Sequence, residues 1–241
     1  YSSAASDVYK RQEVNFAGKI QAVNLGITVN GTIKHENGPV INIKNGASIT
    51  TTADDGVALY GAGRGTYTIE EGAYLEGATG VEVRAGILNV KGGTIVGTGK
   101  ELVSKPNGNG ATTQGAGIAV VQHTTLLPID VTISGGNVKG VKALYVNNTQ
   151  QNPAEAWEKV KVTVEKGTFN TEVDKAYLAE TTTLEQSGNN YVVKPNVKAE
   201  SEGVKFESDD AFSNEYTLVV APKTEKEVKD VTTKLTEAYK A

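Results

Sequence analysis

The chain has no cysteine and no methionine among its 241 residues, and it has no long apolar run. Without cysteine there are no disulfides, no thiolate nucleophile and no Cys-ligated zinc site. A membrane-spanning helix needs about 18 consecutive apolar residues, so we expect no membrane insertion. The net charge of -4 gives no excess of basic residues for phosphate backbones, and we expect no nucleic-acid partner.

The two ends of the chain are predicted to lie outside the main domain. Residues 1–12, YSSAASDVYKRQ, lack strand alternation and the apolar segment of a signal peptide, and they resemble translated adaptor sequence. We therefore predict a non-native or disordered leader at 1–12 and, because no methionine opens the chain, a fragment or processed protein.

A short phrase, apolar-x-apolar-x-x-Gly, recurs along the middle of the chain. The five copies are INIKNG at 41–46, YTIEEG at 67–72, LNVKGG at 88–93, VTISGG at 131–136 and VTVEKG at 162–167. Alternation directs the two apolar side chains to one side of a strand, and glycine permits a sharp bend or a positive φ at the corner that follows. We expect the apolar residues two positions after each glycine to face inward again; these are Tyr74, Ile95, Val138 and Phe169.

A second phrase follows most copies of the first and indicates a repeat with at least two strands. It reads GVAL at 56, GVEV at 80 and GIAV at 117, with looser versions KALY at 142 and KAYL at 175. Repeats of roughly 20–25 residues with insertions are typical of solenoids. We predict an all-β chain, a right-handed parallel β-helix of about six turns, in which the residues at one inward position stack along the rod: Ile43, Ile69, Val90, Ile133 and Val164.

The phrases resemble the pectate-lyase-like β-helix superfamily, and more closely the repeat regions of bacterial cell-surface proteins. The segment KGTFNTEVDKAYLAETTTLEQSGNNYVVKP at 166–195 carries this resemblance best. It implies an extracellular location, with attachment to a cell surface through parts outside this chain. A β-meander or β-sandwich is the structural alternative, because alternating strands and turn signals fit it too.

The composition changes after the last repeat. We assign residues 13–196 to the β-helix and 197–241 to a partial second β-rich module, or to a cap for the last turn. Residues 224–240 are predicted to form an amphipathic helix, since Thr224 and Glu227 have the spacing of a capping box. Two insertions interrupt the repeats, at 97–117 and 147–160, and solenoid insertions often form the binding surface.

An enzyme of the pectate-lyase-like type would hold Ca²⁺ with clustered aspartates and place an Arg or Lys near the scissile bond. The weak candidates are Asp54, Asp55, Arg64 and Arg84, and Ca²⁺ is expected only under this alternative. The aspartate pair reads more simply as a solvated turn. The further acidic candidates are Glu70, Glu71, Glu76 and Glu82. Of these, Glu70 and Glu71 occupy a polar outward slot. Neither His35 nor His123 has a triad or metal-ligand spacing, so we expect loop or surface histidines and no bound cofactor.

Aromatic side chains offer a route to binding, since sugar rings stack on exposed aromatic faces. Tyr67 and Tyr74 fall in inward slots and are predicted to be core residues, whereas Trp157, Tyr60 and Tyr145 are the candidate ligand-binding residues. Our first hypothesis is a non-enzymatic extracellular stalk or adhesin segment that binds a polysaccharide or cell-surface glycan through its loops. The alternative is a polysaccharide lyase or glycoside hydrolase.

Overall fold

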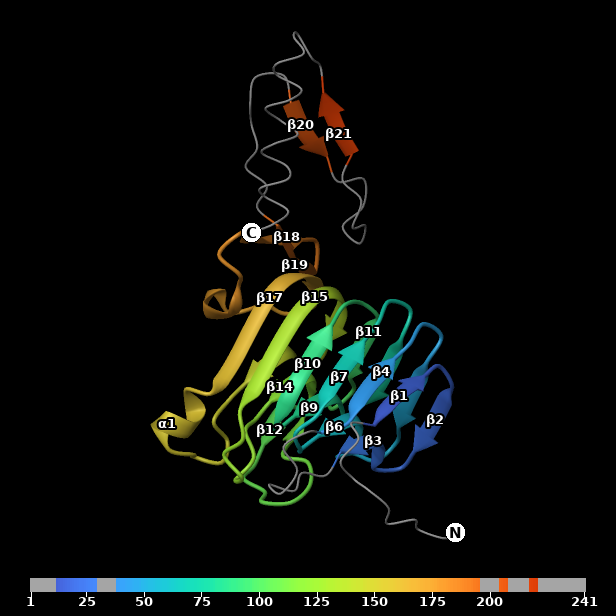
Figure 1. The fold of residues 1–241 in the computed structure, drawn as a ribbon, viewed down its shortest axis with the longest axis vertical. Helices are drawn as coiled ribbons and strands as arrows, with labels where there is room; N and C mark the ends of the chain where they lie inside the picture. Colours follow the sequence, from blue (N-terminus) through green and yellow to red (C-terminus); the bar gives the residue numbers. More distant parts are fainter. Residues whose placement is uncertain (1–11, 30–37, 196–203, 208–216, 221–241) are drawn as a thin grey trace.

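The computed structural model describes residues 12–29, 38–195, 204–207 and 217–220, and this part of the chain is almost entirely β (Figure 1). Each turn of the chain contributes three strand segments, and we call each such turn a coil. Every segment pairs in parallel with its equivalent in the next coil, so three faces run along the molecule. This pairing defines a parallel β-helix and confirms the predicted fold class.

The first two faces share two long strands that turn the corner between them without a break. The first face contains β1 (Glu13–Phe16), β4 (Val40–Ile43), β7 (Thr66–Ile69), β10 (Gly86–Val90) and the first halves of β15 (Ile129–Lys139) and β17 (Val160–Phe169). The second contains β2 (Lys19–Ala22), β5 (Ser48–Thr51), β8 (Tyr74–Gly77), β11 (Thr94–Gly97) and the second halves of β15 and β17. The third face contains β3 (Leu25–Val29), β6 (Val57–Gly61), β9 (Thr79–Val83), β14 (Ala116–Val120) and β16 (Lys142–Val146).

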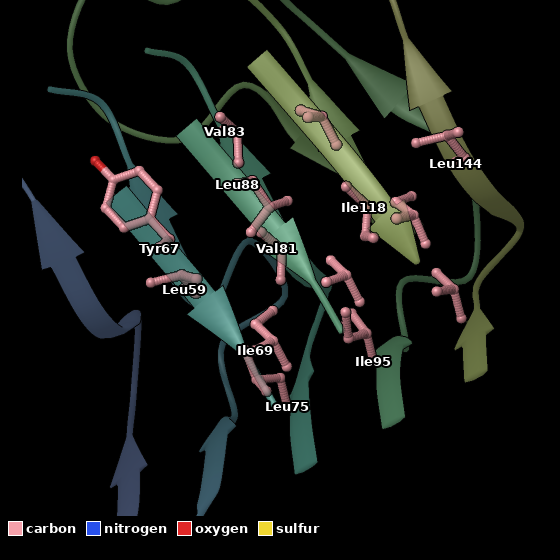
Figure 2. Packing of buried hydrophobic residues seen from close by; sticks show 14 of the residues in the cluster. Leu59, Tyr67, Ile69, Leu75, Val81, Val83, Leu88, Ile95, Ile118 and Leu144 are labelled. Carbon is pink, nitrogen blue, oxygen red and sulfur yellow. The ribbon is translucent and has the colours of Figure 1, made fainter. Parts of the chain in front are cut away.

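The predicted inward ladder is confirmed by the strand register. The paired Cα positions on neighbouring strands are Ile43 with Ile69, Ile69 with Val90, Val90 with Ile133 and Ile133 with Val164. All five side chains are completely buried. Figure 2 shows how residues of the three faces, among them Leu59, Val81 and Ile118 of the third, meet in one core. The repeated phrase therefore encodes the stacking of equivalent apolar side chains.

The predicted inward position of Tyr74 is wrong. Leu75 is completely buried and pairs with Ile49 and Ile95, whereas the half-buried Tyr74 faces outward and donates a hydrogen bond to Glu76. That hydrogen bond is the main reason that the pKa of Tyr74 rises to about 12. The cause is one extra corner residue after glycine in the second and third coils, Ala73 in the case of Tyr74. The other expected residues, Ile95, Val138 and Phe169, are buried as predicted.

The second phrase marks the third face, with one shift and one exception. The register pairs Val81 of GVEV with Leu59 of β6 and with Ile118 of GIAV. In β6 the segment equivalent to GVEV therefore begins at Ala58, two residues after Gly56, where GVAL begins. The KALY segment lies in β16 as expected, whereas KAYL forms the short 3₁₀ helix η1 (Lys175–Tyr177).

At the C-terminal end of the solenoid, antiparallel strands follow the parallel ones. Strand β19 (Asn190–Pro195) pairs antiparallel with β17 and with β18 (Thr182–Ser187), so the parallel pattern stops there. Beyond it, β20 (Val204–Glu207) and β21 (Thr217–Val220) form an antiparallel pair. The predicted helix at 224–240 lies outside the described residues. No helix in the described ranges is long and apolar enough to span a membrane.

Candidate functional site

The outer side of the third face is covered, unlike that of a simple solenoid. Tyr60, Glu82 and Ala119 occupy equivalent outward positions on β6, β9 and β14, because the register pairs Tyr60 with Glu82 and Glu82 with Ala119. All three are nevertheless buried. The insertion at 97–117, which includes the short antiparallel strands β12 (Val103–Ser104) and β13 (Thr113–Gln114), supplies the residues that contact Tyr60 and Glu82.

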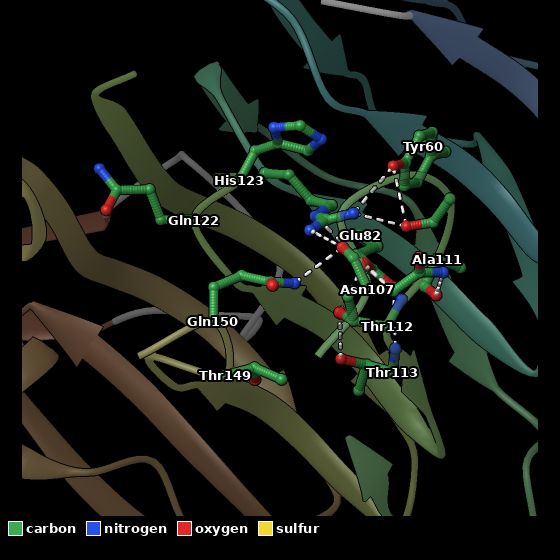
Figure 3. A network of polar contacts seen from close by, with 12 residues as sticks. Tyr60, Glu82, Asn107, Ala111, Thr112, Thr113, Gln122, His123, Thr149 and Gln150 are labelled. Atoms are coloured by element: carbon green, nitrogen blue, oxygen red, sulfur yellow. Dashed lines mark hydrogen bonds and ion pairs between the residues drawn. The ribbon is translucent and has the colours of Figure 1, made fainter. Parts of the chain in front are cut away.

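Glu82 attaches one part of this insertion to the third face (Figure 3). Its carboxylate accepts hydrogen bonds from the backbone amides of Thr112 and Thr113, at 2.9 and 3.1 Å, and from the Thr112 hydroxyl at 2.8 Å. Burial raises the pKa of Glu82, and these hydrogen bonds together with the charge of Arg84 oppose that rise. A carboxylate with three donors is well satisfied although it is removed from water.

Arg84 attaches the preceding part of the same insertion. Its guanidinium donates to the carbonyl oxygens of Asn107, at 2.7 Å, and Gly110, and to the Tyr60 hydroxyl at 3.1 Å. Arg84 Nε lies 3.8 Å from a carboxylate oxygen of Glu82, which is an ion contact rather than a hydrogen bond. Both side chains of the pair have no exposed surface. We call Glu82 and Arg84 the loop clamp.

The second insertion, at 147–160, is fixed by buried amides. The Asn152 side chain donates to the Gln122 side chain at 3.1 Å and to the His123 carbonyl at 3.1 Å. Gln122 in turn donates to the carbonyl of Ala156, in the single turn of helix α1 (Ala154–Trp157), at 2.9 Å. Asn148 and Asn152 also bond to each other in both directions at 2.8 Å, which encloses the turn between them.

The two insertions meet each other. The hydroxyls of Ser104 and Thr149 lie 2.7 Å apart, and the Gln150 amide donates to the Asn107 carbonyl at 2.8 Å. We call the area that they form the two-loop surface, and its exposed or half-exposed amide side chains include Asn107, Asn109, Asn147, Gln150 and Gln151. Uncharged amides both donate and accept hydrogen bonds, as a ligand with many hydroxyl groups requires.

His123 lies half-buried beside the loop clamp, in the connection from β14 to β15. Its Nδ1 accepts a hydrogen bond from the Thr125 amide at 3.1 Å, so this nitrogen carries no proton in that arrangement. Burial, and next the charge of Arg84, lower the pKa of His123, although a hydrogen bond to the Gly108 carbonyl acts in the opposite direction.

We predict that His123 makes the protein less stable in mild acid. The unfolded chain takes up the proton near the ordinary histidine pKa of about 6.5, whereas the folded chain resists it to lower pH. The contribution of His123 to the free energy of unfolding is thus fully present above the ordinary histidine pKa. It is lost as the pH falls from that value towards the lower pKa of the folded state. Urea unfolding of the wild type and His123→Gln from pH 8 to pH 5 measures this. Equal pH dependence in the two proteins contradicts the prediction.

The structure does not bring the candidate catalytic residues together. Asp54 and Asp55 are exposed in the turn before β6, at one end of the third face. Arg64 follows the other end of β6, and Arg84 follows the same end of β9 and is fully buried. Four strand steps of about 3.3 Å separate the two ends. Within the described ranges, no group of three or more His, Asp or Glu side chains is arranged to hold a metal.

The candidate aromatic residues have different surroundings. Tyr60 is 4% exposed, and its hydroxyl donates to the Gly110 carbonyl, so the expectation of an exposed Tyr60 is wrong. Tyr145 is half-buried and accepts a hydrogen bond from Asn147 at 2.6 Å, and Trp157 is half-buried in the second insertion. His35 lies outside the described residues. Sequence reasoning missed the structural roles of Gln122 and Asn152, for which the repeats contain no signal.

Comparison of the chain with protein-family models, with curated proteins and with solved structures gives no match in any of the three.

Proposed function

We propose that this chain is a non-enzymatic binding module: an extracellular β-helix stalk or adhesin segment of a larger bacterial surface protein that binds a glycan through the two-loop surface. The observation that carries the proposal is the joining of two insertions, one of which covers the third face, with each fixed by buried polar side chains. Loops that are ordered before binding lose little conformational entropy on binding, which favours affinity.

The backbone of the second insertion supports a binding role. Gln151 adopts a φ of 55°, a left-handed conformation that non-glycine residues rarely accept. The reciprocal hydrogen bonds between Asn148 and Asn152 hold the turn that contains it. Backbone strain of this kind is found mainly at functional sites, where the surrounding structure maintains it.

The exposed charged side chains of the two insertions are balanced in sign, which favours a neutral, hydroxyl-rich ligand over a charged one; they are Lys100, Glu101, Lys105, Glu155, Glu158 and Lys159. The amide side chains of the two-loop surface offer both donors and acceptors, and the half-buried Trp157 of the second insertion is the aromatic side chain proposed to stack on a sugar ring. Of the two candidate catalytic arginines, Arg84 is occupied by the backbone carbonyls of Asn107 and Gly110.

Glycan binding should depend on Trp157 and Asn109. We expect Trp157→Ala to weaken binding roughly tenfold, because a stacked ring contributes about 1.4 kcal/mol, and Asn109→Ala to weaken it less. A glycan array followed by titration of the best ligand measures both. Glu71→Ala, an exposed change on the corner between β7 and β8, is the control and should bind as the wild type does.

The same samples distinguish the module from an enzyme. Incubation with pectin-type and other acidic polysaccharides, with and without Ca²⁺, should release neither unsaturated products nor new reducing ends. Turnover that the exposed change Asp55→Ala abolishes would overturn the proposal in favour of a polysaccharide lyase or glycoside hydrolase. If Trp157→Ala melts as the wild type does and still binds the glycan with unchanged affinity, the glycan does not bind at the two-loop surface.

A further inference from the structure

Three Asn–Gly pairs lie within the described residues. Asn45–Gly46 is at the corner between β4 and β5, and Asn107–Gly108 and Asn109–Gly110 follow each other in the insertion at 97–117. An asparagine side chain is most easily attacked by the next backbone nitrogen when the next residue is glycine, because glycine has no Cβ to obstruct the approach. The side-chain amide must be able to turn toward that nitrogen, so the contacts at each pair decide whether it can react.

Two of the three pairs are held by hydrogen bonds. The Gly46 amide donates to the Gly72 carbonyl of the next coil at 3.3 Å, so the attacking nitrogen of that pair is engaged. In the side-chain amide of Asn107, the oxygen accepts from the Asn109 backbone amide at 3.1 Å and the nitrogen donates to the Ala111 carbonyl at 3.2 Å. Reaction at either pair first requires these hydrogen bonds to break.

The third pair is not held in this way. The Asn109 side chain is exposed, and neither it nor the Gly110 amide donates or accepts a hydrogen bond with another described residue. Gly110 adopts a φ of 95°, a conformation that glycine accepts without strain. The Gly110 carbonyl is fixed by Arg84 and by the Tyr60 hydroxyl, the latter at 3.0 Å, so the backbone stays in place while the Asn109 side chain turns.

We propose that Asn109 is a site of spontaneous covalent modification in the folded protein. The Gly110 nitrogen loses its proton and bonds to the side-chain carbonyl carbon of Asn109, and the side-chain nitrogen leaves as ammonia. Water then opens the resulting succinimide ring at either carbonyl, which gives aspartate or isoaspartate. One water is consumed and one ammonia is released, with no oxidant or cofactor. Base removes the Gly110 proton, so the reaction accelerates as the pH rises.

The modification changes both the charge and the backbone of the two-loop surface. Either product replaces a neutral amide with a carboxylate, in a chain whose net charge is already -4. In isoaspartate the backbone also runs through the former side-chain carbon, which lengthens the chain directly before Gly110. Because the Gly110 carbonyl accepts from Arg84, this product disturbs the loop clamp, whereas ordinary aspartate does not. No step involves a glycan, so the inference is independent of the proposed function.

Peptide mapping by mass spectrometry, with fragmentation that separates aspartate from isoaspartate, tests the proposal on the full chain in mildly alkaline buffer. We expect Asn109 to lose its amide at least tenfold faster than Asn107 and Asn45, since those two pairs must first break hydrogen bonds. In urea the contacts are lost, and Asn107 and Asn109, which both precede glycine, should react at similar rates. The matched control is Asn109→Gln, whose longer side chain disfavours ring closure and should remain an amide.

Three results would overturn the proposal. In the folded protein, Asn107 or Asn45 could react as fast as Asn109, or Asn109 could stay intact while the chain in urea reacts. An equal preference for Asn109 in urea and in the folded protein would show that the local sequence, and not the fold, selects the site. The isoaspartate form, separated by ion exchange, should exchange the Thr112 amide faster than Asn109→Asp does; equal exchange would contradict the effect on the loop clamp.

Discussion

Replacing Arg84 with methionine is expected to destabilise the protein by about 3–5 kcal/mol, because it removes one partner of a buried ion pair. Glu82 would keep its hydrogen bonds to Thr112 and Thr113 but lose the neighbouring positive charge. The carbonyls of Asn107 and Gly110 would also lose a buried donor. Urea unfolding followed by circular dichroism measures the change in free energy.

Two comparisons show whether that loss comes from the loop clamp. Arg64→Met makes the same change in the equivalent connection one coil earlier, where the side chain is only half-buried, and should cost less. Combining Arg84→Met with Glu82→Gln should cost less than the sum of the two single changes, since residues in one network are not additive. A surface substitution typically changes the free energy of unfolding by no more than about 0.5 kcal/mol. A change of that size in Arg84→Met would contradict the role assigned to the loop clamp.

Ile133→Ala is expected to cost about 2–5 kcal/mol by leaving a cavity in the inward ladder. Ile133 is fully buried and stacks between Val90 and Val164 of the neighbouring coils, so little relaxation is available. Glu71→Ala, at an exposed corner, should change stability by no more than about 0.5 kcal/mol. If denaturant melts give the reverse order, the assignment of inward and outward faces is wrong.

The core could be predicted from the sequence because its pattern repeats. Each member of the ladder has the same neighbours along the chain, an apolar residue two before it and a glycine three after it, so five copies align without a structure. The method failed where a corner changes length. Ala73 shifts Tyr74 outward, and the first coil, although inside the predicted β-helix, has no copy of the phrase because Gly18 comes only two residues after Phe16, which pairs with Ile43.

The candidate site could be predicted only as two insertions, without their contacts. Glu82 and Tyr60 occupy outward slots in the repeat, and outward slots are normally exposed. They are buried because residues 107–113, distant in sequence from both, fold back over them. Such contacts between an irregular segment and a strand follow no period, so alternation cannot reveal them. The exposed turn at Asp54 and Asp55 was predicted correctly because it is a local feature.

The claim that the insertions are fixed parts of the fold, and not mobile loops, is tested most directly by amide hydrogen exchange on the full chain. The backbone amides of Thr112 and Thr113 donate to buried Glu82 and should exchange slowly, on the timescale of the amide of Val121, which donates to the Val83 carbonyl of the third face. Exchange of Thr112 and Thr113 as fast as that of exposed loop amides would contradict a surface that is ordered before it binds.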